Sequence, residues 1–346
     1  MRIAVYTIAK NEAQHVQRWA ETTQDADHRL ILDTGSTDNT RHLADSHAIN
    51  TQLVQFFPWR FDVARNHALS LLPDDIDMCI ALDMDEILNP MWREQLEYYL
   101  GARPDVTRPR YKYVWSWNPD GSEGLVYGGD KIHARHGYHW KHPVHEVITP
   151  TDTEIQGWVP GLEIHHHPDP TKSRGQYFDL LKLAVQEEPN DDRNQFYLGR
   201  EYFYHGDKIN ATRHLISATL LSKWPAEIAA AYRMLYKLNR NVINLYRALE
   251  QDPCRRETLV MLARHYHDQH HWQACYQFAQ AALHITDKPL DYLCEADAWG
   301  WLPHDLLAVA CWHLGYRYEA RVHGEQAALL NPTDERLKTN LVWYGV

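Results

Sequence analysis

Several features that would assign a protein to a class are scarce or missing here. The 346 residues include only five cysteines, and no two of them form a CxxC pair, so the sequence predicts neither a zinc site nor a disulfide framework. No apolar run approaches the roughly 20 residues that a membrane-spanning helix needs. Residues 1–7 are too short an apolar start for a signal peptide. These absences favour a protein of the reducing cytoplasm.

Positive charge and glycine-rich phosphate loops are also lacking. The net charge is −11, which argues against a broad surface that follows nucleic-acid phosphates. The first predicted strand is followed by Ala9-Lys10-Asn11-Glu12, which is neither a GxGxxG turn nor the glycine-rich basic loop that holds a nucleoside triphosphate. The sequence therefore disfavours both an NAD-dependent enzyme and a nucleotidyltransferase.

The composition and the order of apolar segments indicate two domains, the first of them α/β. Apolar residues make up 44% of the chain, enough for a packed core, and 346 residues suffice for two domains. Alternating strand and helix patterns in the N-terminal half predict a parallel sheet with helices on both faces. The predicted strands are 3–8, 30–32, 54–56 and 79–82, and the helices include residues 16–20 and 61–72.

The most informative stretch is residues 79–86, an apolar strand that ends in Asp83, Asp85 and Glu86. In open α/β sheets, ligands lie beyond the carboxyl ends of the strands. Three crowded carboxylates repel one another unless a cation or hydrogen-bond donors compensate. Hard oxygen ligands of this kind suit Mg²⁺ or Mn²⁺, often shared with substrate phosphates. The competing interpretation is a solvated acidic loop, and the motif alone does not decide between them.

Four motifs together resemble the family 2 glycosyltransferases. Each one alone is weak, but they occur in the right order, each at a predicted strand end or helix start. The resemblance covers about residues 1–170 and implies a GT-A fold that binds a nucleotide-sugar at the carboxyl edge of its sheet. The motifs are Lys10-Asn11-Glu12, Asp33-Thr34-Gly35-Ser36-Thr37-Asp38, Trp59…Phe61-Asp62…Ala64-Arg65-Asn66 and Leu82-Asp83-Met84-Asp85-Glu86.

The resemblance implies roles for the residues at the first two strand ends. Thr7, Asn11 and Glu12 match the end of the first strand, which borders the nucleotide base in the family. Asp33 matches the carboxylate that contacts the base or the ribose, because a carboxylate can accept bonds from N–H and hydroxyl groups there.

Three further residues match positions near the phosphates, the ribose or the metal. Arg65 matches a basic residue near the nucleotide, where a guanidinium can bond phosphate. The simpler alternative for Arg65 is an ion pair with Asp62. The resemblance implies that Asp83 contacts ribose or metal, and that Asp85 ligates the Mn²⁺ or Mg²⁺ ion that bridges the diphosphate.

An aromatic strand and a polar stretch follow the acidic motif. Tyr111, Tyr113, Trp115 and Trp117 alternate, which predicts a strand with one aromatic face, either packed in the core or forming a sugar platform. In the family the next region carries the acceptor side and the general base. The best candidate for that base is Glu146, with Asp130 and His145 behind it. The alternative for Glu146 is a structural pair with a His or Lys, and Asp130 also counts among the expected nucleotide-sugar contacts.

Three consecutive histidines end the α/β half. Strand alternation would place His165 and His167 on one face and His166 on the other. The family often supplies a His near this point as a further metal ligand, so His165 or His167 is expected to complete a site with Asp85. Surface histidines satisfied by solvent are the alternative.

From about residue 173 the apolar period becomes helical, and the pattern resembles tetratricopeptide repeats. Units are predicted to begin near Asp192, Arg256 and Trp301, with a degenerate helix pair over 226–250 and an insertion before the third unit. The small residues let paired helices approach closely. Four histidines, His265, His267, His270 and His271, invite a metal assignment, but a turn near residues 269–271 argues against it.

The combined interpretation is a GT-A glycosyltransferase domain over 1–172 and a TPR-like helical domain over 173–346. The enzyme would use Mn²⁺ or Mg²⁺ and a nucleotide-diphospho-sugar, with a UDP-sugar favoured, and would transfer the sugar with inversion, as the family resemblance implies. The acceptor stays open between peptide, glycan and modified nucleobase, and the repeats could mediate a homodimer. The rival hypothesis is a non-catalytic scaffold whose repeats recruit a partner.

Overall fold

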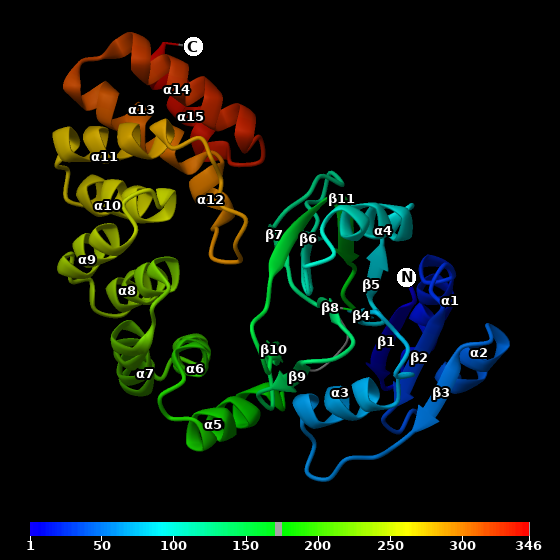
Figure 1. Cartoon of the computed structure of the whole chain (residues 1–346). Coiled ribbons are helices and arrows are strands. Elements are labelled where there is room, and N and C mark those ends of the chain that lie inside the picture. Colours follow the sequence, from blue (N-terminus) through cyan, green and yellow to red (C-terminus); the bar gives the residue numbers. More distant parts are fainter. Residues whose placement is uncertain (170–174, 346) are drawn as a thin grey trace. The chain divides into compact units, whose positions relative to one another are not determined.

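The computed structural model describes residues 1–169 and 175–345 and divides the chain into two compact units. The units are Met1–Ala184 and Val185–Val346. The first is α/β and the second is entirely helical, as the sequence predicted. The predicted domain boundary between residues 172 and 173 lies outside the described residues. Figure 1 shows both units with their elements labelled.

The first unit is built on a five-stranded sheet in the order β3-β2-β1-β4-β8. The first four of these strands are parallel, as expected from the alternation of strands and helices, and β8 pairs antiparallel with β4. Their bounds are β1 Ile3–Ala9, β2 His28–Asp33, β3 Asn50–Leu53, β4 Met78–Ala81 and β8 Ile132–Ala134.

Helices cover the two faces of this sheet because side chains alternate along each strand. Ile3 and Val5 of β1 lie in one apolar cluster with residues of α1. Ala4 and Tyr6 lie in another with residues of α3. The helices of this unit are α1 Ala13–Thr22, α2 Thr40–Ser46, α3 Phe61–Ser70, α4 Trp92–Ala102 and α5 Tyr177–Glu187, the last of which crosses the division between units.

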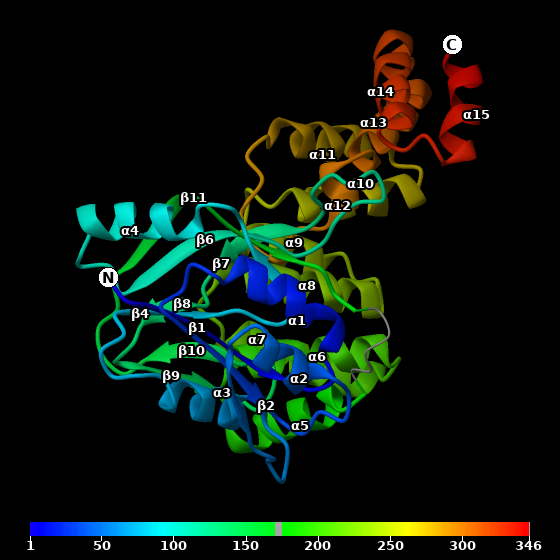
Figure 2. The same cartoon turned by 90° about the vertical axis from the view of Figure 1, so that its right-hand side faces the viewer.

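A second sheet, which the sequence did not predict as separate, has the order β5-β11-β6-β7 and packs against α4 (Figure 2). The expected aromatic strand 111–117 is β6, displaced by three residues toward the N-terminus. A small two-stranded sheet pairs β9 with β10. The bounds are β5 Glu86–Leu88, β6 Arg108–Val114, β7 Val126–Gly129, β9 Tyr138–Lys141, β10 Val147–Pro150 and β11 Gln156–His166.

The expected strand at 54–56 is wrong, because the third strand is β3, residues 50–53. Its side chains are mostly polar and exposed, as suits the outer strand of a sheet. The apolar Val54 and Phe56 instead follow the strand and pack against the apolar cluster that includes Tyr6. The apolar residues 54–56 therefore cover the core, and the polar residues 50–53 form the strand.

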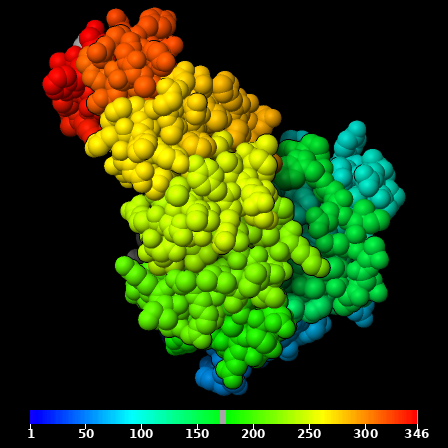
Figure 3. Space-filling view, turned by 90° about the vertical axis from the view of Figure 1, so that its left-hand side faces the viewer, coloured from blue at the N-terminus to red at the C-terminus, as the bar shows by residue number. Residues whose placement is uncertain are grey.

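The second unit consists of helices that pack as antiparallel pairs, and each predicted repeat coincides with one pair. Figure 3 shows one face of this unit, along which successive pairs are stacked. The pairs are α6 Asp192–Tyr204 with α7 Lys208–Leu221, α8 Pro225–Asn239 with α9 Ile243–Gln251, α10 Arg256–Asp268 with α11 Trp272–His284, and α13 Leu302–Leu314 with α14 Arg317–Leu330. The short α12 Ala296–Trp299 precedes the last pair, and α15 Glu335–Tyr344 follows it.

Small residues set the spacing within the pairs, as the repeat pattern predicted. A Cβ atom placed on Gly199 of α6 would lie 2.9 Å from Cγ of Leu215 in α7, so only glycine allows this approach. The expected insertion is present between α11 and α13. The predicted turn at 269–271 follows the end of α10. Across the described residues, no helix combines the length and the apolar character that crossing a bilayer requires.

Candidate active site

Charged side chains gather at the carboxyl end of the parallel sheet. Strands β2 and β4 flank β1, so Asp33 at the end of β2 and Asp83 just after β4 belong to the same edge. The loop that follows β4 turns directly into β5, with the Glu86 backbone N–H donating to the Asp83 carbonyl oxygen. This connection holds Asp83, Asp85 and Glu86 within one short turn.

Asp83 accepts from two cations. Nη2 of Arg65 lies 2.7 Å from Oδ1 of Asp83, and Nζ of Lys131 lies 2.9 Å from Oδ2. Burial alone would raise the pKa of Asp83, but the charges and hydrogen bonds of Arg65 and Lys131 outweigh it and hold that pKa below its usual value. Asp83 is therefore a carboxylate whose oxygens are both engaged by side chains of this chain.

Lys131 also holds Glu86, whose side chain is almost completely buried. Its Nζ lies 2.6 Å from Oε1 of Glu86, and the Tyr113 hydroxyl donates to the same oxygen. Burial raises the pKa of Glu86, although Lys131 and Tyr113 oppose the shift. The backbone N–H of Asp83 donates to Oε2 of Glu86 at 2.8 Å. Glu86 thus fixes the loop and orients Lys131.

Arg65 links Asp83 to Glu146. Its Nε lies 2.5 Å from Oε1 of Glu146, and its guanidinium lies over the Trp140 ring at 4.9 Å from the centroid. The proposed ion pair with Asp62 is not formed, since Asp62 pairs with Arg60 at 2.8 Å. Nη1 of Arg65 is buried and has no hydrogen-bond partner in the described part of the chain.

The histidine beside Asp85 is not one of the two that strand alternation favoured. Nε2 of His166 lies 3.4 Å from Oδ2 of Asp85, whereas the His165 ring bonds Glu163 at 2.8 Å and the His167 ring stacks on Trp117. The alternation itself is present, because His166 is buried and its two neighbours are half-buried. The His166 face of β11 is the one that meets Asp85, whereas the sequence favoured the face of His165 and His167.

Nδ1 of His166 is 3.0 Å from the Trp115 carbonyl oxygen, so this nitrogen carries the proton it donates. The bond fixes the ring and directs Nε2 toward Asp85. Burial opposes protonation of His166, but the hydrogen bonds to Asp85 and to the Trp115 carbonyl oxygen outweigh it and raise its pKa. Asp85 and His166 therefore face each other across a gap that a cation or a proton must bridge.

Asp33 lies at the end of β2 with one oxygen engaged and one free. Its Oδ1 accepts from the backbone N–H groups of Gly35 and Ser36 at 2.9 and 2.8 Å. Its Oδ2 is buried and has no partner among the described residues. A buried carboxylate oxygen without a donor is costly, which marks Asp33 as a site where a ligand N–H or hydroxyl would fit.

The other residues expected near the base are tied to the protein itself. Thr7 is buried, and its hydroxyl donates to the Ile8 carbonyl oxygen. Oδ1 of Asn11 accepts from the backbone N–H of Thr37 at 2.8 Å, and the Glu12 backbone N–H donates to Oγ1 of Thr40. Asn11 and Glu12 thus tie the end of β1 to the loop before α2, which supports the shape of the edge.

Aromatic side chains line one side of the acidic loop. Trp115 stacks on His166 with centroids 4.3 Å apart, and Tyr113 is buried against Glu86. Core packing accounts for Tyr113, while Trp115 packs on the ring of His166 in the site.

The two reserve candidates for the general base have other contacts. Asp130 pairs with Arg108 at 3.2 Å, and the His145 ring meets Tyr177 edge to face.

The sequence interpretation missed Lys131 and gave Glu86 no specific role. Lys131 stood next to Asp130, which drew attention as a carboxylate. The pattern that could have found Lys131 is its position just before β8, the strand that pairs with β4 and so brings it to the acidic loop. That pairing is antiparallel and joins distant parts of the chain, so no local sequence pattern predicts it.

Comparison with known proteins gives partial structural matches. No protein-family model and no curated protein matches the sequence. The N-terminal part matches glucosyl-3-phosphoglycerate synthase from Mycobacterium tuberculosis, solved with Mn²⁺ and UDP, at 22% identity and a TM-score of 0.28, over 32% of this chain and 44% of that one. TarS of S. aureus is 10% identical with a TM-score of 0.42, over 71% of this chain and 54% of that one.

The helical part matches repeat proteins. MamA is 15% identical with a TM-score of 0.35, over 46% of this chain and 89% of that one. TTC0263, a thermophilic TPR protein from Thermus thermophilus, is 16% identical with a TM-score of 0.33, over 48% of this chain and 88% of that one. Matches of both expected kinds are thus found, and none assigns the chain to a family. The chain spans less than half the length of the glucosyl-3-phosphoglycerate synthase.

Proposed function

We propose that the chain is a metal-dependent glycosyltransferase that moves a sugar from a nucleotide-diphospho-sugar to an acceptor hydroxyl or thiol. The observation that carries the proposal is the ionised cluster at the carboxyl edge of the sheet, where Arg65 and Lys131 clamp Asp83 beside Asp85 and His166. Buried charges cost stability unless each one is paired. A fold keeps such a cluster at a ligand edge when the ligand uses it.

The donor base would bind at Asp33. The free Oδ2 of this buried carboxylate can accept an N–H from uracil or guanine. The neighbouring Oδ1 is held by backbone N–H groups, so the carboxylate is oriented before the ligand arrives. UDP is therefore the first nucleotide to test, with GDP and TDP as alternatives.

Asp85 and His166 fit a divalent cation better than Asp83 does. One carboxylate and one imidazole nitrogen face each other at 3.4 Å, and both donor types suit Mn²⁺. Both oxygens of Asp83 already accept from side chains. His165 and His167, the ligands expected from the sequence, have ring contacts elsewhere, although the His167 backbone N–H donates to the Asp85 carbonyl oxygen at 2.8 Å. When bound, the ion would neutralise the departing diphosphate.

Glu146 is the proposed base, and Arg65 is the residue that orients it. The Glu146 carboxylate accepts from Nε of Arg65, which fixes its position relative to Asp83. From there it would take the acceptor proton as the acceptor oxygen or sulfur attacks the anomeric carbon. Inversion at that carbon follows the family resemblance. The acceptor, whether peptide, glycan or modified nucleobase, and a homodimer through the helical unit remain hypotheses.

Calorimetric titration of UDP, GDP and TDP, with and without Mn²⁺, tests the donor site. One nucleotide is expected to bind only with Mn²⁺, and Asp85→Ala and His166→Ala are expected to abolish that Mn²⁺-dependent binding. His165→Ala and Asp105→Ala are matched controls, the second because Asp105 forms an exposed pair with Arg103. These two variants should bind as the unmodified chain does.

The same titration separates the proposal from its rival. If the folded protein binds none of the three nucleotides, the glycosyltransferase proposal fails and a non-catalytic scaffold becomes the leading hypothesis. Nucleotide binding without turnover of any UDP-, GDP- or TDP-sugar, with water included as acceptor, would favour a sugar-nucleotide-binding scaffold.

A further inference from the structure

Residues 286–295, here called the strap, lie across the first helices of three successive pairs in the helical unit. Tyr292 stacks on Tyr197 of α6, and its hydroxyl donates to Glu227 of α8 at 3.2 Å. Asp291 pairs with Arg255, the residue that immediately precedes α10. The strap is the first part of the insertion between α11 and α13, and this surface of α6, α8 and α10 is called the first-helix surface below.

Charge on the strap complements charge on the first-helix surface. The strap carries three carboxylates and one lysine. Arg255 holds Asp291 through two bonds of 3.1 and 2.8 Å, a paired geometry that fixes orientation as well as position. Glu295 lies 3.5 Å from Nε of Arg233 and 3.3 Å from Nζ of Lys237.

Apolar anchors accompany these ion pairs. Leu293 is buried in the cluster that contains Phe196 of α6 and Met234 of α8. Trp224 meets Tyr292 edge to face. An aromatic and an aliphatic side chain flanked by carboxylates thus reach the surface from one short turn at residues 290–293.

The strap is attached through side chains rather than through backbone pairing. It forms no helix or strand. Its Leu293 backbone N–H donates to its own Asp291 side chain, and its Glu295 backbone N–H donates to Oε1 of Glu257 at 3.1 Å. A segment held in this way contacts the surface as a bound peptide would.

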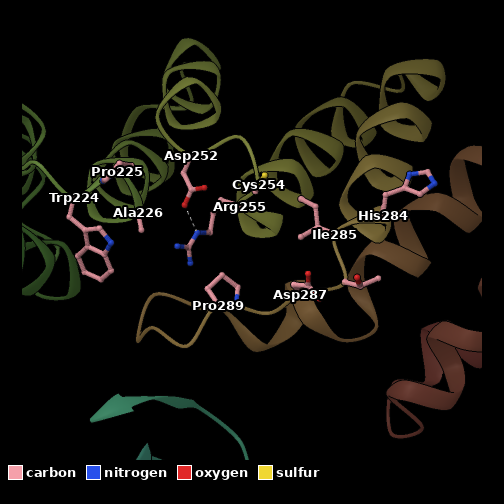
Figure 4. A pocket seen from close by; sticks show the side chains of 11 residues that line it. Trp224, Pro225, Ala226, Asp252, Cys254, Arg255, His284, Ile285, Asp287 and Pro289 are labelled. Atoms are coloured by element: carbon pink, nitrogen blue, oxygen red, sulfur yellow. Dashed lines mark hydrogen bonds and ion pairs between the residues drawn. The ribbon is translucent and has the colours of Figure 1, made fainter. Parts of the chain in front are cut away.

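The strap leaves part of the first-helix surface unsatisfied. Nη1 of Arg233, Nε of Arg256 and Oε2 of Glu257 are buried without a hydrogen-bond partner in the described part of the chain. Buried polar groups of this kind are rare unless a ligand or water completes them. A cavity of about 600 Å³ opens beside the strap, with Trp224, Arg255 and Pro289 among its walls (Figure 4). The strap therefore leaves these single donor and acceptor atoms without a partner and leaves space beside it unfilled.

We propose that the first-helix surface binds an acidic segment of a partner protein, with an aromatic and an aliphatic anchor, and that the strap is its displaceable internal competitor. A tethered competitor acts at an effective concentration in the millimolar range for short linkers. External binding is therefore weak until the strap is released. The inference stands independently of the glycosyltransferase proposal, since every residue it uses lies in the second unit.

The test uses the full chain and a labelled peptide with the sequence of residues 285–297. Fluorescence anisotropy is expected to show at least ten-fold tighter binding to Asp291→Asn than to the unmodified chain, because the variant strap loses its charged bond to Arg255. Asp287→Asn removes the same charge from an exposed position of the strap and should behave as the unmodified chain does. A peptide carrying the Asp291→Asn change should bind at least ten-fold more weakly than the unaltered peptide.

Cysteine alkylation of the unmodified chain supplies a second readout, which does not require that a variant folds. Cys294 is a buried strap residue, Cys254 is exposed, and Cys275 and Cys311 are buried in the helix core. If the strap opens alone, Cys294 should react more slowly than Cys254 and at least ten-fold faster than Cys275 and Cys311. Added peptide should speed its reaction further.

Three results would overturn the proposal. Cys294 could react only as fast as the core cysteines, which would make the strap an integral part of the fold. The peptide could bind the Asp291→Asn variant no better than the unmodified chain. Sedimentation could show that this variant dimerises by exchanging straps, which would make the occupant a second copy of the chain.

Discussion

At the scale of single residues, the first unit is defined by which carboxylate each cation holds. Arg65 pairs with Asp83 and Glu146, and Lys131 pairs with Asp83 and Glu86. Within this network two cations face three carboxylates, so one negative charge remains before Asp85 is counted. That balance suits a site whose ligand brings a divalent cation.

Glu146→Gln separates a base from a structural partner of Arg65. If Glu146 takes the acceptor proton, kcat should fall by about 10²–10⁴-fold while KM for the nucleotide-sugar stays within a few-fold. Steady-state kinetics on the variant measures both constants. A large rise in KM with little change in kcat would show instead that Glu146 acts only by holding Arg65.

Lys131→Met should destabilise the first unit strongly. Removing one partner of a buried ion pair leaves the other unpaired, which costs about 3–5 kcal/mol. The side chain left behind is Glu86, which is 1% exposed. The double variant Lys131→Met with Glu86→Gln should recover part of that loss in urea-unfolding free energy. If the two changes simply add, the pair carries no coupling and the electrostatic account is wrong.

His304 and His323 should make the last helix pair sensitive to acid. Their Nδ1 atoms lie 3.0 Å apart, and burial, helped by His323 and Arg256, lowers the pKa of His304 from 6.5 to about 4. As pH falls from about 6.5 to 4, His304 binds a proton in the unfolded state but stays neutral in the folded state, so the free energy of unfolding decreases. Because His304 is only half buried, screening reduces the loss to about 1–2 kcal/mol.

Native-state hydrogen exchange of α13 and α14 at pH 7 and pH 5 would measure this loss. The variant His304→Asn should show a smaller pH dependence than the unmodified chain. His284→Asn changes an exposed histidine and serves as the control. An unchanged pH dependence in His304→Asn would assign the effect to other groups.

At the scale of elements, the helical unit depends on close approach within pairs. Gly199→Ala would place a Cβ atom 2.9 Å from Cγ and 3.0 Å from the backbone nitrogen of Leu215. Because the backbone of α7 cannot move away without strain, the free energy of unfolding of the variant should fall by about 1–3 kcal/mol. A Cβ atom on Gly101 of α4 would have no atom within 4 Å. Gly101→Ala should therefore raise the free energy of unfolding by up to about 1 kcal/mol through helix propensity. Thermal unfolding followed by circular dichroism tests both signs.

The sequence predicted most elements but not every strand, for reasons that individual segments make clear. The buried strands β1, β2 and β4 each contain a run of buried, mostly apolar residues, which is the signal that located them. The outer strand β3 is polar because solvent covers it, and its place was misassigned to Val54–Phe56. The helix pairs were predictable because their period and small residues are local signals.

At the scale of the whole molecule, the two units have separate apolar cores and should unfold as separate transitions. One core is built on the central sheet, and another on α10, α11, α13 and α14. If the proposed donor site is correct, the matching nucleotide with Mn²⁺ at 100 times its dissociation constant should stabilise the first unit by about 2.7 kcal/mol.

Differential scanning calorimetry would measure this effect. Only one transition should move to higher temperature, and it should not move in Asp85→Ala. If both transitions moved by the same amount, the ligand would be binding both units, or the units would unfold together. Asp105→Ala, an exposed change in the same unit, controls for unspecific destabilisation.

The sequence by itself determined the alternation of strands and helices up to β4, the acidic strand end and the repeat architecture, because each depends on residues that are near one another in the chain. Only the tertiary structure decided which charges meet. Lys131 reaches Asp83 through the pairing of β8 with β4, and His166 reaches Asp85 because β11 pairs with β5. Such contacts join residues 48 and 81 positions apart, and strand register, which local pattern does not fix, sets which side chain faces the site.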